Sequence, residues 1–236
     1  MRILHKQSKV EAAAHAADLL RQHLLTAIEH PVLLLLSGGS SLEVLQTLSI
    51  DNMPRTFSIG MVDERYVPEK EKQNGPILHQ TCFIRQTQLK GVPFVPIEMS
   101  GTANPAECAT RYELSLKEWR RAFPDGIISA ILGIGSDGHV AGVLPYAERK
   151  NWFLEKFVDT HAWMVGYDTQ GKGEFPARVS ASLHFLMQEV NYAVVYACGE
   201  EKKPIIESLE QGKGELSQLP ARVLSLMKEV DVCTDQ

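Results

Sequence analysis

A histidine and an aspartate lie two residues apart on a glycine-rich turn in the middle of the chain. Residues 131–145 read ILGIGSDGHVAGVLP, so an apolar run leads into a turn that carries Asp137 and His139. Histidine is a common general base near neutral pH, and a neighbouring carboxylate can orient its ring or stabilise its charged form. The glycines free backbone amides and let a ligand approach closely. Although a lone histidine is more often structural, this turn predicts a catalytic site.

The same turn contains a G-x-G-x-x-G pattern at Gly133, Gly135 and Gly138, which also occurs in dinucleotide-binding proteins. Two features disfavour that interpretation. Pro145 would interrupt the helix that should follow, and the pattern lies in mid-chain instead of in an opening βαβ unit. The sequence has no G-x-S-x-G nucleophile elbow and no histidine pair with metal spacing. We therefore expect water to attack the substrate directly, with no metal and no cofactor.

Two other apolar runs end in polar residues. The run 32–36 leads into SGGSS at 37–41, whose amides and hydroxyls could hold a phosphate or could simply begin a helix. The run 57–62 is followed by Asp63, Glu64 and Arg65, of which at least one should face the site unless an Asp–Arg pair pins the loop. Further along the chain, the positively charged side chains of Arg178 and Lys202 could bind one anion together. Each of them alone would be ordinary surface charge.

Short apolar runs alternate with helix-period segments along the whole chain, which is typical of a mostly parallel α/β sheet with helices on both faces. We expect strands at residues 32–36, 57–62, 94–97, 127–134, 163–167 and 192–197. We expect helices at residues 10–28, 42–48, 105–123 and 203–209, and a mobile loop at 171–176. Ligands of such sheets bind outside the carboxyl ends of the strands, so the polar residues there should meet at one edge.

The composition indicates a globular protein and argues against large anionic partners. The 236 residues are 44% hydrophobic and 22% charged, which suits one domain over residues 1–236 with a large core. A net charge of −5 argues against nucleic acid or anionic membrane as a partner. We find no secretory signal pattern and no apolar run of about 20 residues that could span a membrane. Four scattered cysteines fit a reducing compartment, so we expect a cytoplasmic protein. We also expect a monomer or small homo-oligomer.

Taken together, six motifs resemble those of the 6-phosphogluconolactonase family, which belongs to a wider group that includes glucosamine-6-phosphate deaminase. They are SGGSS at 37–41, DERYVP at 63–68, LGIGSDGHVAGVLP at 132–145, ARVSAS at 177–182, GEEK at 199–202 and LPARVL at 219–224. The resemblance covers nearly the whole chain and implies a Rossmann-like fold of the sugar-phosphate isomerase type. It also implies hydrolysis of 6-phospho-glucono-1,5-lactone to 6-phosphogluconate, in the oxidative pentose phosphate pathway and without a cofactor.

The resemblance further implies a role for each site residue. His139 resembles the general base that takes a proton from water, with Asp137 supporting it and Asp63 or Asp137 as the next candidates for the base. The residues that would bind the sugar phosphate are Gly38, Gly39, Ser40, Ser41, Arg65, Arg178 and Lys202. Donors for the developing oxyanion could come from the amides of the glycine turn or from Arg65.

Two alternatives differ from hydrolysis of the lactone. A deaminase would carry an Asn-Glu-Pro segment after the histidine, where this chain has VLP at 143–145, and an aromatic residue where this chain has Arg65. A sugar-phosphate-binding protein without activity is the other alternative. The chain also departs from the lactonase pattern, because Val140, Gly142 and Leu144 replace Thr, Ser and Phe. We expect these changes to reshape the sugar pocket while the enzyme stays active.

Overall fold

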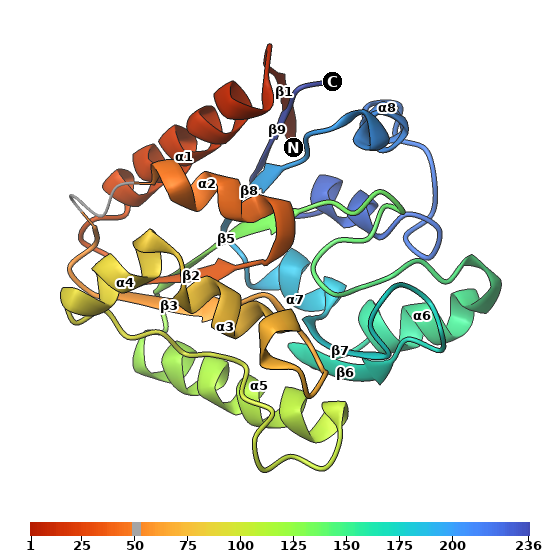
Figure 1. The fold of residues 1–236 in the computed structure, drawn as a ribbon, viewed down its shortest axis with the longest axis horizontal. Coiled ribbons are helices and arrows are strands. Elements are labelled where there is room, and N and C mark those ends of the chain that lie inside the picture. The colour runs from red at the N-terminus through yellow and green to blue at the C-terminus, as the bar shows by residue number, and fades with distance from the viewer. Residues whose placement is uncertain (49–52) are drawn as a thin grey trace.

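The computed structural model describes residues 1–48 and 53–236, and within them nine strands form two sheets (Figure 1). The main sheet has six parallel strands in the order β1-β9-β8-β5-β2-β3. The bounds of these strands are β1 Arg2–His5, β9 Val230–Thr234, β8 Tyr192–Tyr196, β5 Ile127–Gly133, β2 Val32–Leu36 and β3 Phe57–Met61. The smaller sheet is antiparallel and consists of β4 Asp63–Arg65, β7 Ala177–Ala181 and β6 Met164–Asp168.

Helices flank both sheets. Their bounds are α1 Lys9–Thr26, α2 Leu42–Thr47, α3 Asn74–His79, α4 Cys82–Leu89, α5 Pro105–Ala122, α6 Lys150–Phe157, α7 Leu183–Gln188 and α8 Lys203–Glu210. Helix α1 packs on β8 and β9 and also against α2, whereas α5 packs on β6 and β7 along the lower edge of Figure 1. The predicted α/β class, with a mostly parallel sheet flanked by helices, is confirmed.

The two longest helices begin at residues that suit a helix N-terminus. Ser8 accepts a hydrogen bond from the backbone N–H of Glu11 at 3.2 Å, and Asn104 accepts one from Glu107 at 2.9 Å. Pro105 occupies the first turn of α5, where a missing N–H costs nothing. Alanines and leucines at helical spacing then bury one face of α1, which brings its backbone close to the sheet.

The predicted strand 94–97 is wrong. Only an isolated bridge between Phe94 and Ile59 forms there, because Pro93 and Pro96 have no N–H to donate to a ladder. The strict alternation of strand and helix is also wrong, since no helix separates β3 from β4 or β6 from β7. The structure adds four strands that we did not predict, β1, β4, β7 and β9, and four short helices, α3, α4, α6 and α7.

Val62 joins the two sheets. It lies between β3 and β4, where its N–H donates to the carbonyl of Leu36 at 2.9 Å and its own carbonyl accepts from Ala181 at 2.8 Å. The first bond belongs to the edge of the main sheet and the second to the smaller sheet. The two sheets therefore meet at the carboxyl end of β3.

Most of the buried hydrophobic side chains form one cluster that runs from Ala12 to Cys233, and Val67, Phe175 and Ala177 are buried outside it. Three of the four cysteines are buried, and Cys82 at the start of α4 is exposed. Across residues 1–48 and 53–236, we find no helix with the length and apolarity needed to cross a membrane.

Candidate functional site

A cavity of about 410 Å³ opens at the carboxyl edge of the main sheet, next to the smaller sheet. Small-molecule sites commonly have volumes of about 300–1,000 Å³. Its walls come from the segments after β2, β3, β5 and β8, from β7, and from the loop that precedes β7. The residues predicted from sequence that line it are Gly38, Gly39, Ser40, Asp63, Arg65, Asp137, His139, Arg178 and Lys202.

Ser41 is the predicted site residue that does not line the cavity. Its side chain is buried, and its hydroxyl donates to the carbonyls of Ser37 at 3.1 Å and Gly38 at 2.9 Å. A hydroxyl engaged in this way stabilises the turn after β2. We therefore leave Ser41 out of the proposed anion site.

His139 and Asp137 form a close pair on the cavity wall. Nδ1 of His139 lies 2.5 Å from Oδ1 of Asp137, which also accepts the backbone N–H of His139 at 3.1 Å. Burial alone would raise the pKa of Asp137, but the hydrogen bond and charge of His139 lower it to about 2. An ionised Asp137 accepts the Nδ1 proton and leaves a lone pair on Nε2 of the neutral ring. The imidazole is 30% exposed and lines the cavity.

The segment after β5 contains no dinucleotide-binding helix. Ile134 instead forms a bridge with Val140, which also bridges Val143, and the next α-helix is α6. The G-x-G-x-x-G pattern therefore builds the compact turn that carries His139. This agrees with the sequence argument from Pro145.

The turn after β2 places two glycines at the cavity wall for different reasons. Gly39 has φ +68°, a backbone conformation that favours glycine. Gly38 has an ordinary extended backbone, but a Cβ there would lie 2.1 Å from Oδ1 of Asn74. Gly38 is thus needed because the Asn74 amide packs directly against it.

Arg65 and Arg178 supply two positive charges to the same wall. They are register partners on the antiparallel strands β4 and β7, so their side chains share one face of the smaller sheet. Arg65 donates to the carbonyl of Lys72 at 3.0 Å. Arg178 is only 8% exposed, its Nε has no hydrogen-bond partner, and it forms no ion pair within the described part of the chain.

Lys202 is the third cation at the cavity. It follows β8 at the start of α8 and is 9% exposed. Its Nζ lies 3.8 Å from a carboxylate oxygen of Glu201, a contact too long for a hydrogen bond. A buried ammonium with so little compensation favours an anion in the cavity.

Asp63 and Glu64 both follow strand β3 of the main sheet, but their side chains make different contacts. Asp63 is buried at the cavity wall, and Asn74 donates its side-chain amide to one carboxylate oxygen at 3.2 Å. Glu64 points away from the cavity, where it accepts the backbone N–H groups of Arg65 at 2.7 Å, Asn74 at 2.5 Å and Gly75 at 2.7 Å. Glu64 therefore fixes the start of α3, which in turn fixes Asn74.

Burial raises the pKa of both acids. For Asp63, the positive charge of Arg178, followed by that of His139, opposes the increase. For Glu64, burial outweighs three backbone hydrogen bonds and raises the pKa to about 7. The charge of Asp63 is therefore coupled to His139 and to the arginines Arg178 and Arg65.

Sequence reasoning missed Asn74 and Phe175 at this cavity. Asn74 lies eleven residues after Asp63 in an unpredicted short helix, so no local pattern connects the two. Phe175 lies in the loop predicted at 171–176, and its ring lies against two arginines. An aromatic residue within a glycine-rich loop is the one sequence signal that could have marked it.

No group of three or more potential metal-ligating side chains occurs among the residues that the structure describes.

Two relatives illustrate the similarity of the sequence to known proteins. A 6-phosphogluconolactonase of Xylella fastidiosa is 28% identical over 181 residues, which cover 74% of this chain and 70% of that protein. A Caenorhabditis elegans protein with the printed name "Putative 6-phosphogluconolactonase" is 29% identical over 185 residues. The alignment covers 73% of this chain but only 63% of the nematode protein, so the chain spans less than two thirds of that relative.

Solved structures show the same fold at lower sequence identity. A 6-phosphogluconolactonase from Shewanella baltica superposes with a TM-score of 0.77 at 20% identity, covering 98% of this chain and 96% of that one. The enzyme from Trypanosoma brucei gives a TM-score of 0.74 at 19% identity, covering 98% and 95%. The family model described as glucosamine-6-phosphate isomerases/6-phosphogluconolactonase matches residues 7–233, nearly the whole chain. The chain therefore belongs to the glucosamine-6-phosphate isomerase/6-phosphogluconolactonase family.

Proposed function

We propose that this protein hydrolyses 6-phospho-glucono-1,5-lactone to 6-phosphogluconate, as the names of its relatives indicate. One observation carries the proposal: an oriented imidazole and three cations line the same cavity. The imidazole suits attack of water on an activated carbonyl, and the cations suit a phosphate monoester. A substrate with a lactone at one end and a phosphate at the other would contact both the imidazole and the cations.

In the proposed reaction, His139 Nε2 takes a proton from water as the water oxygen bonds to the lactone carbonyl carbon. The tetrahedral intermediate then collapses, the bond between that carbon and the ring oxygen breaks, and the proton on Nε2 passes to the departing oxygen. Asp137 holds the ring through Nδ1 and stabilises the imidazolium that forms between these steps. A lactone is already reactive, so positioning and modest base catalysis supply the rate.

The phosphate would lie against Arg178, Lys202 and the turn after β2. Arg178 and Lys202 are buried and poorly compensated, which is costly unless an anion enters. The backbone at Gly38 and Gly39 and the hydroxyl of Ser40 line the same cavity and can add neutral donors. Arg65 completes the positive wall beside Arg178.

The segment after the histidine argues against a deaminase. A deaminase of this family pattern would need a carboxylate near position 144, but Val143 and Leu144 are apolar and buried there. Leu144 also forms part of the cavity wall. The cavity thus has no acid at that position to assist ring opening of an amino sugar.

Turnover of freshly generated lactone tests the proposal, with the rate corrected for spontaneous hydrolysis. We expect acceleration with the phosphorylated lactone, a higher KM for glucono-1,5-lactone, and no ammonia release from glucosamine 6-phosphate. EDTA should leave the activity intact. Ammonia release without lactone hydrolysis would support the deaminase, and binding of 6-phosphogluconate without turnover would support a binding protein.

Three finer expectations belong to the same proposal. We propose that the protein acts as one domain over residues 1–236, as a monomer or small homo-oligomer, and in the cytoplasm. Size-exclusion chromatography with light scattering tests the assembly, and fractionation of cells tests the location.

A further inference from the structure

One aromatic ring contacts both arginines of the cavity. The guanidinium carbon of Arg65 lies 4.6 Å from the centre of the Phe175 ring, and that of Arg178 lies 5.8 Å from it. Phe175 is 7% exposed and lines the cavity, although it belongs to the loop between β6 and β7 and to neither arginine-bearing strand.

The arrangement of the two arginines needs such a contact. Like charges directly opposite each other on antiparallel strands repel, and Arg65 and Arg178 are register partners. The face of an aromatic ring attracts a guanidinium while leaving the N–H groups at the edge of the guanidinium free to bind an anion. The side chain of Arg178 has no hydrogen bond or ion pair to any described residue, and the Phe175 ring is an identified contact of its guanidinium group.

The loop that carries Phe175 is fastened at its base. The hydroxyl of Thr169 donates to the carbonyls of Phe175 at 2.8 Å and Pro176 at 3.0 Å, and its backbone N–H donates to Pro176 at 2.8 Å. Thr169 is itself fully buried, and its carbonyl accepts the hydroxyl of Tyr146 at 2.8 Å. The backbone beneath the ring is therefore fixed to the core before any ligand binds.

We propose that Phe175 is a positioning residue that holds Arg65 and Arg178 in the orientation required by a phosphate monoester dianion. The loop between β6 and β7 thereby sets the preference for a phosphorylated over an unphosphorylated sugar lactone. This inference rests on the proposed function, because it assigns the phosphate to the wall formed by the two arginines.

Substitutions of Phe175 distinguish orientation of the two arginines by the aromatic ring from simple packing by an apolar side chain. Phe175→Leu keeps an apolar side chain but removes the aromatic face, and Phe175→Tyr keeps the face. With the phosphorylated lactone, we expect Phe175→Leu to raise KM about tenfold, the factor that corresponds to loss of one or two cation–π contacts. Its kcat should stay within about threefold of wild type, and its KM for glucono-1,5-lactone should not change. Phe175→Tyr should restore the wild-type KM.

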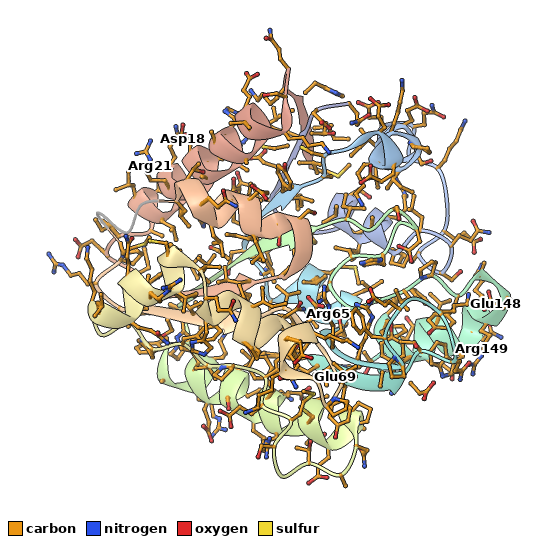
Figure 2. The ribbon with its side chains drawn as sticks, in the orientation of Figure 1. Asp18, Arg21, Arg65, Glu69, Glu148 and Arg149 are labelled. Atoms are coloured by element: carbon orange, nitrogen blue, oxygen red, sulfur yellow. The ribbon has the colours of Figure 1, made fainter. Side chains whose placement is uncertain are left out.

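Trp119 provides a matched control. Its ring lies 5.6 Å from the guanidinium carbon of Arg120 near the end of α5, whereas Arg65 lies near the middle of the view in Figure 2. Neither Trp119 nor Arg120 lines the cavity, so Trp119→Leu removes an arginine–aromatic contact elsewhere and both KM values should match wild type. If Phe175→Leu fails to fold, Phe175→Met supplies the same loss of the ring with a flexible apolar side chain.

Binding of inorganic phosphate provides a readout that does not depend on turnover. Its Kd, measured by calorimetry, should be about tenfold weaker in Phe175→Leu than in wild type. Equal phosphate affinity and equal KM in the two proteins would overturn the inference while leaving the proposed function intact. An inactive wild type whose phosphate affinity still falls in Phe175→Leu would overturn the proposed function and support the positioning role.

Discussion

The imidazole of His139 occupies the space that a side chain on Gly135 would need. A Cβ at position 135 would lie 2.0 Å from Nδ1 of His139 and 2.6 Å from Oδ1 of Asp137. The two backbones are also tied, because the N–H of Gly135 donates to the carbonyl of His139 at 2.9 Å. The turn can hold the ring in this position only because residue 135 lacks a side chain.

Gly135→Ala should therefore lower kcat in the same direction as His139→Ala, but by a smaller factor. We expect His139→Ala to lower kcat by about 10²- to 10⁴-fold with a smaller change in KM, as for loss of a general base. Gly135→Ala should lower kcat at least tenfold by displacing the ring. Gly133→Ala is the comparison, because a Cβ there meets no atom closer than 3.8 Å and should cost far less activity. Near-normal kcat in His139→Ala would assign the base to another residue.

The pair of Asp137 and His139 predicts how stability depends on pH. The pKa of Asp137 is lowered from 3.8 to about 2 in the folded protein, so the carboxylate stabilises the fold above the unfolded value. This contribution should disappear as the pH falls from about 4 to about 2. Because Asp137 is half-exposed, we expect a contribution of at most about 1 kcal/mol.

Urea unfolding of wild type and Asp137→Asn between pH 7 and pH 2.5 measures this effect. Wild type should be the more stable protein at pH 7, and the difference should shrink toward the acid end. Asp159→Asn, at an exposed position, supplies the comparison. A gap between wild type and Asp137→Asn that grows with acid would contradict the assigned direction of the pKa shift.

Arg178 and Lys202 should bind one phosphate together. Arg178→Met and Lys202→Met should each weaken 6-phosphogluconate binding at least tenfold, since each removes a buried positive charge from the cavity. In the double variant the loss should be smaller than the product of the two, because the groups share one ligand. Calorimetry measures the affinities, with Lys203→Met at the adjacent exposed position as the control. Fully multiplicative losses would show that the two cations contribute independently and contradict the expected coupling.

Position 142 should tolerate no side chain in this background. A Cβ on Gly142 would lie 2.9 Å from the Cβ of Ser180 and 3.3 Å from that of Asp63, and the N–H of Gly142 already donates to the Ser180 hydroxyl at 2.9 Å. Gly142→Ser should therefore lower the free energy of unfolding by about 1–3 kcal/mol, the usual cost of overpacking. Ser180→Gly should recover part of this loss in the double variant. Urea titration of both single variants and the double measures the coupling, and additive losses would exclude it.

Much of the site could be predicted because functional residues follow apolar strands. The run VLLLL at β2 is buried on both faces, and such continuous runs are unambiguous in a parallel sheet. The polar residues after β2, β3 and β5 then had to lie at one edge. His139 and Asp137 were predicted as a pair because a turn of two residues brings neighbours in sequence together in space.

What the sequence could not predict depends on contacts between distant segments. Strand β7 reads ARVSA, in which Arg178 and Ser180 interrupt the apolar pattern although the strand is buried, because their polar groups meet the cavity and Gly142. Strands β1 and β9 lie side by side although more than 220 residues separate them, and Figure 1 shows the two termini together. Arg2 and Asp231 are joined there by an ion pair of 2.6 Å that no local pattern indicates.

Under the proposed roles, the smaller sheet sets the preference for the substrate and the main sheet carries the residues of the hydrolytic chemistry. The turn with His139 follows β5, which has a neighbour on each side in the main sheet, whereas Phe175 lies on a loop between two strands of the smaller sheet. Thr169 ties the base of that loop, and Lys172 Nζ donates to the carbonyl of Pro145 at 2.9 Å, six residues after His139. Substitutions that spare Thr169 and Lys172 leave these bonds in place. Under the proposed roles, the substrate preference can therefore change without rebuilding the turn that carries His139. Directed evolution toward new lactones should keep Lys172 and begin at residues 173–175.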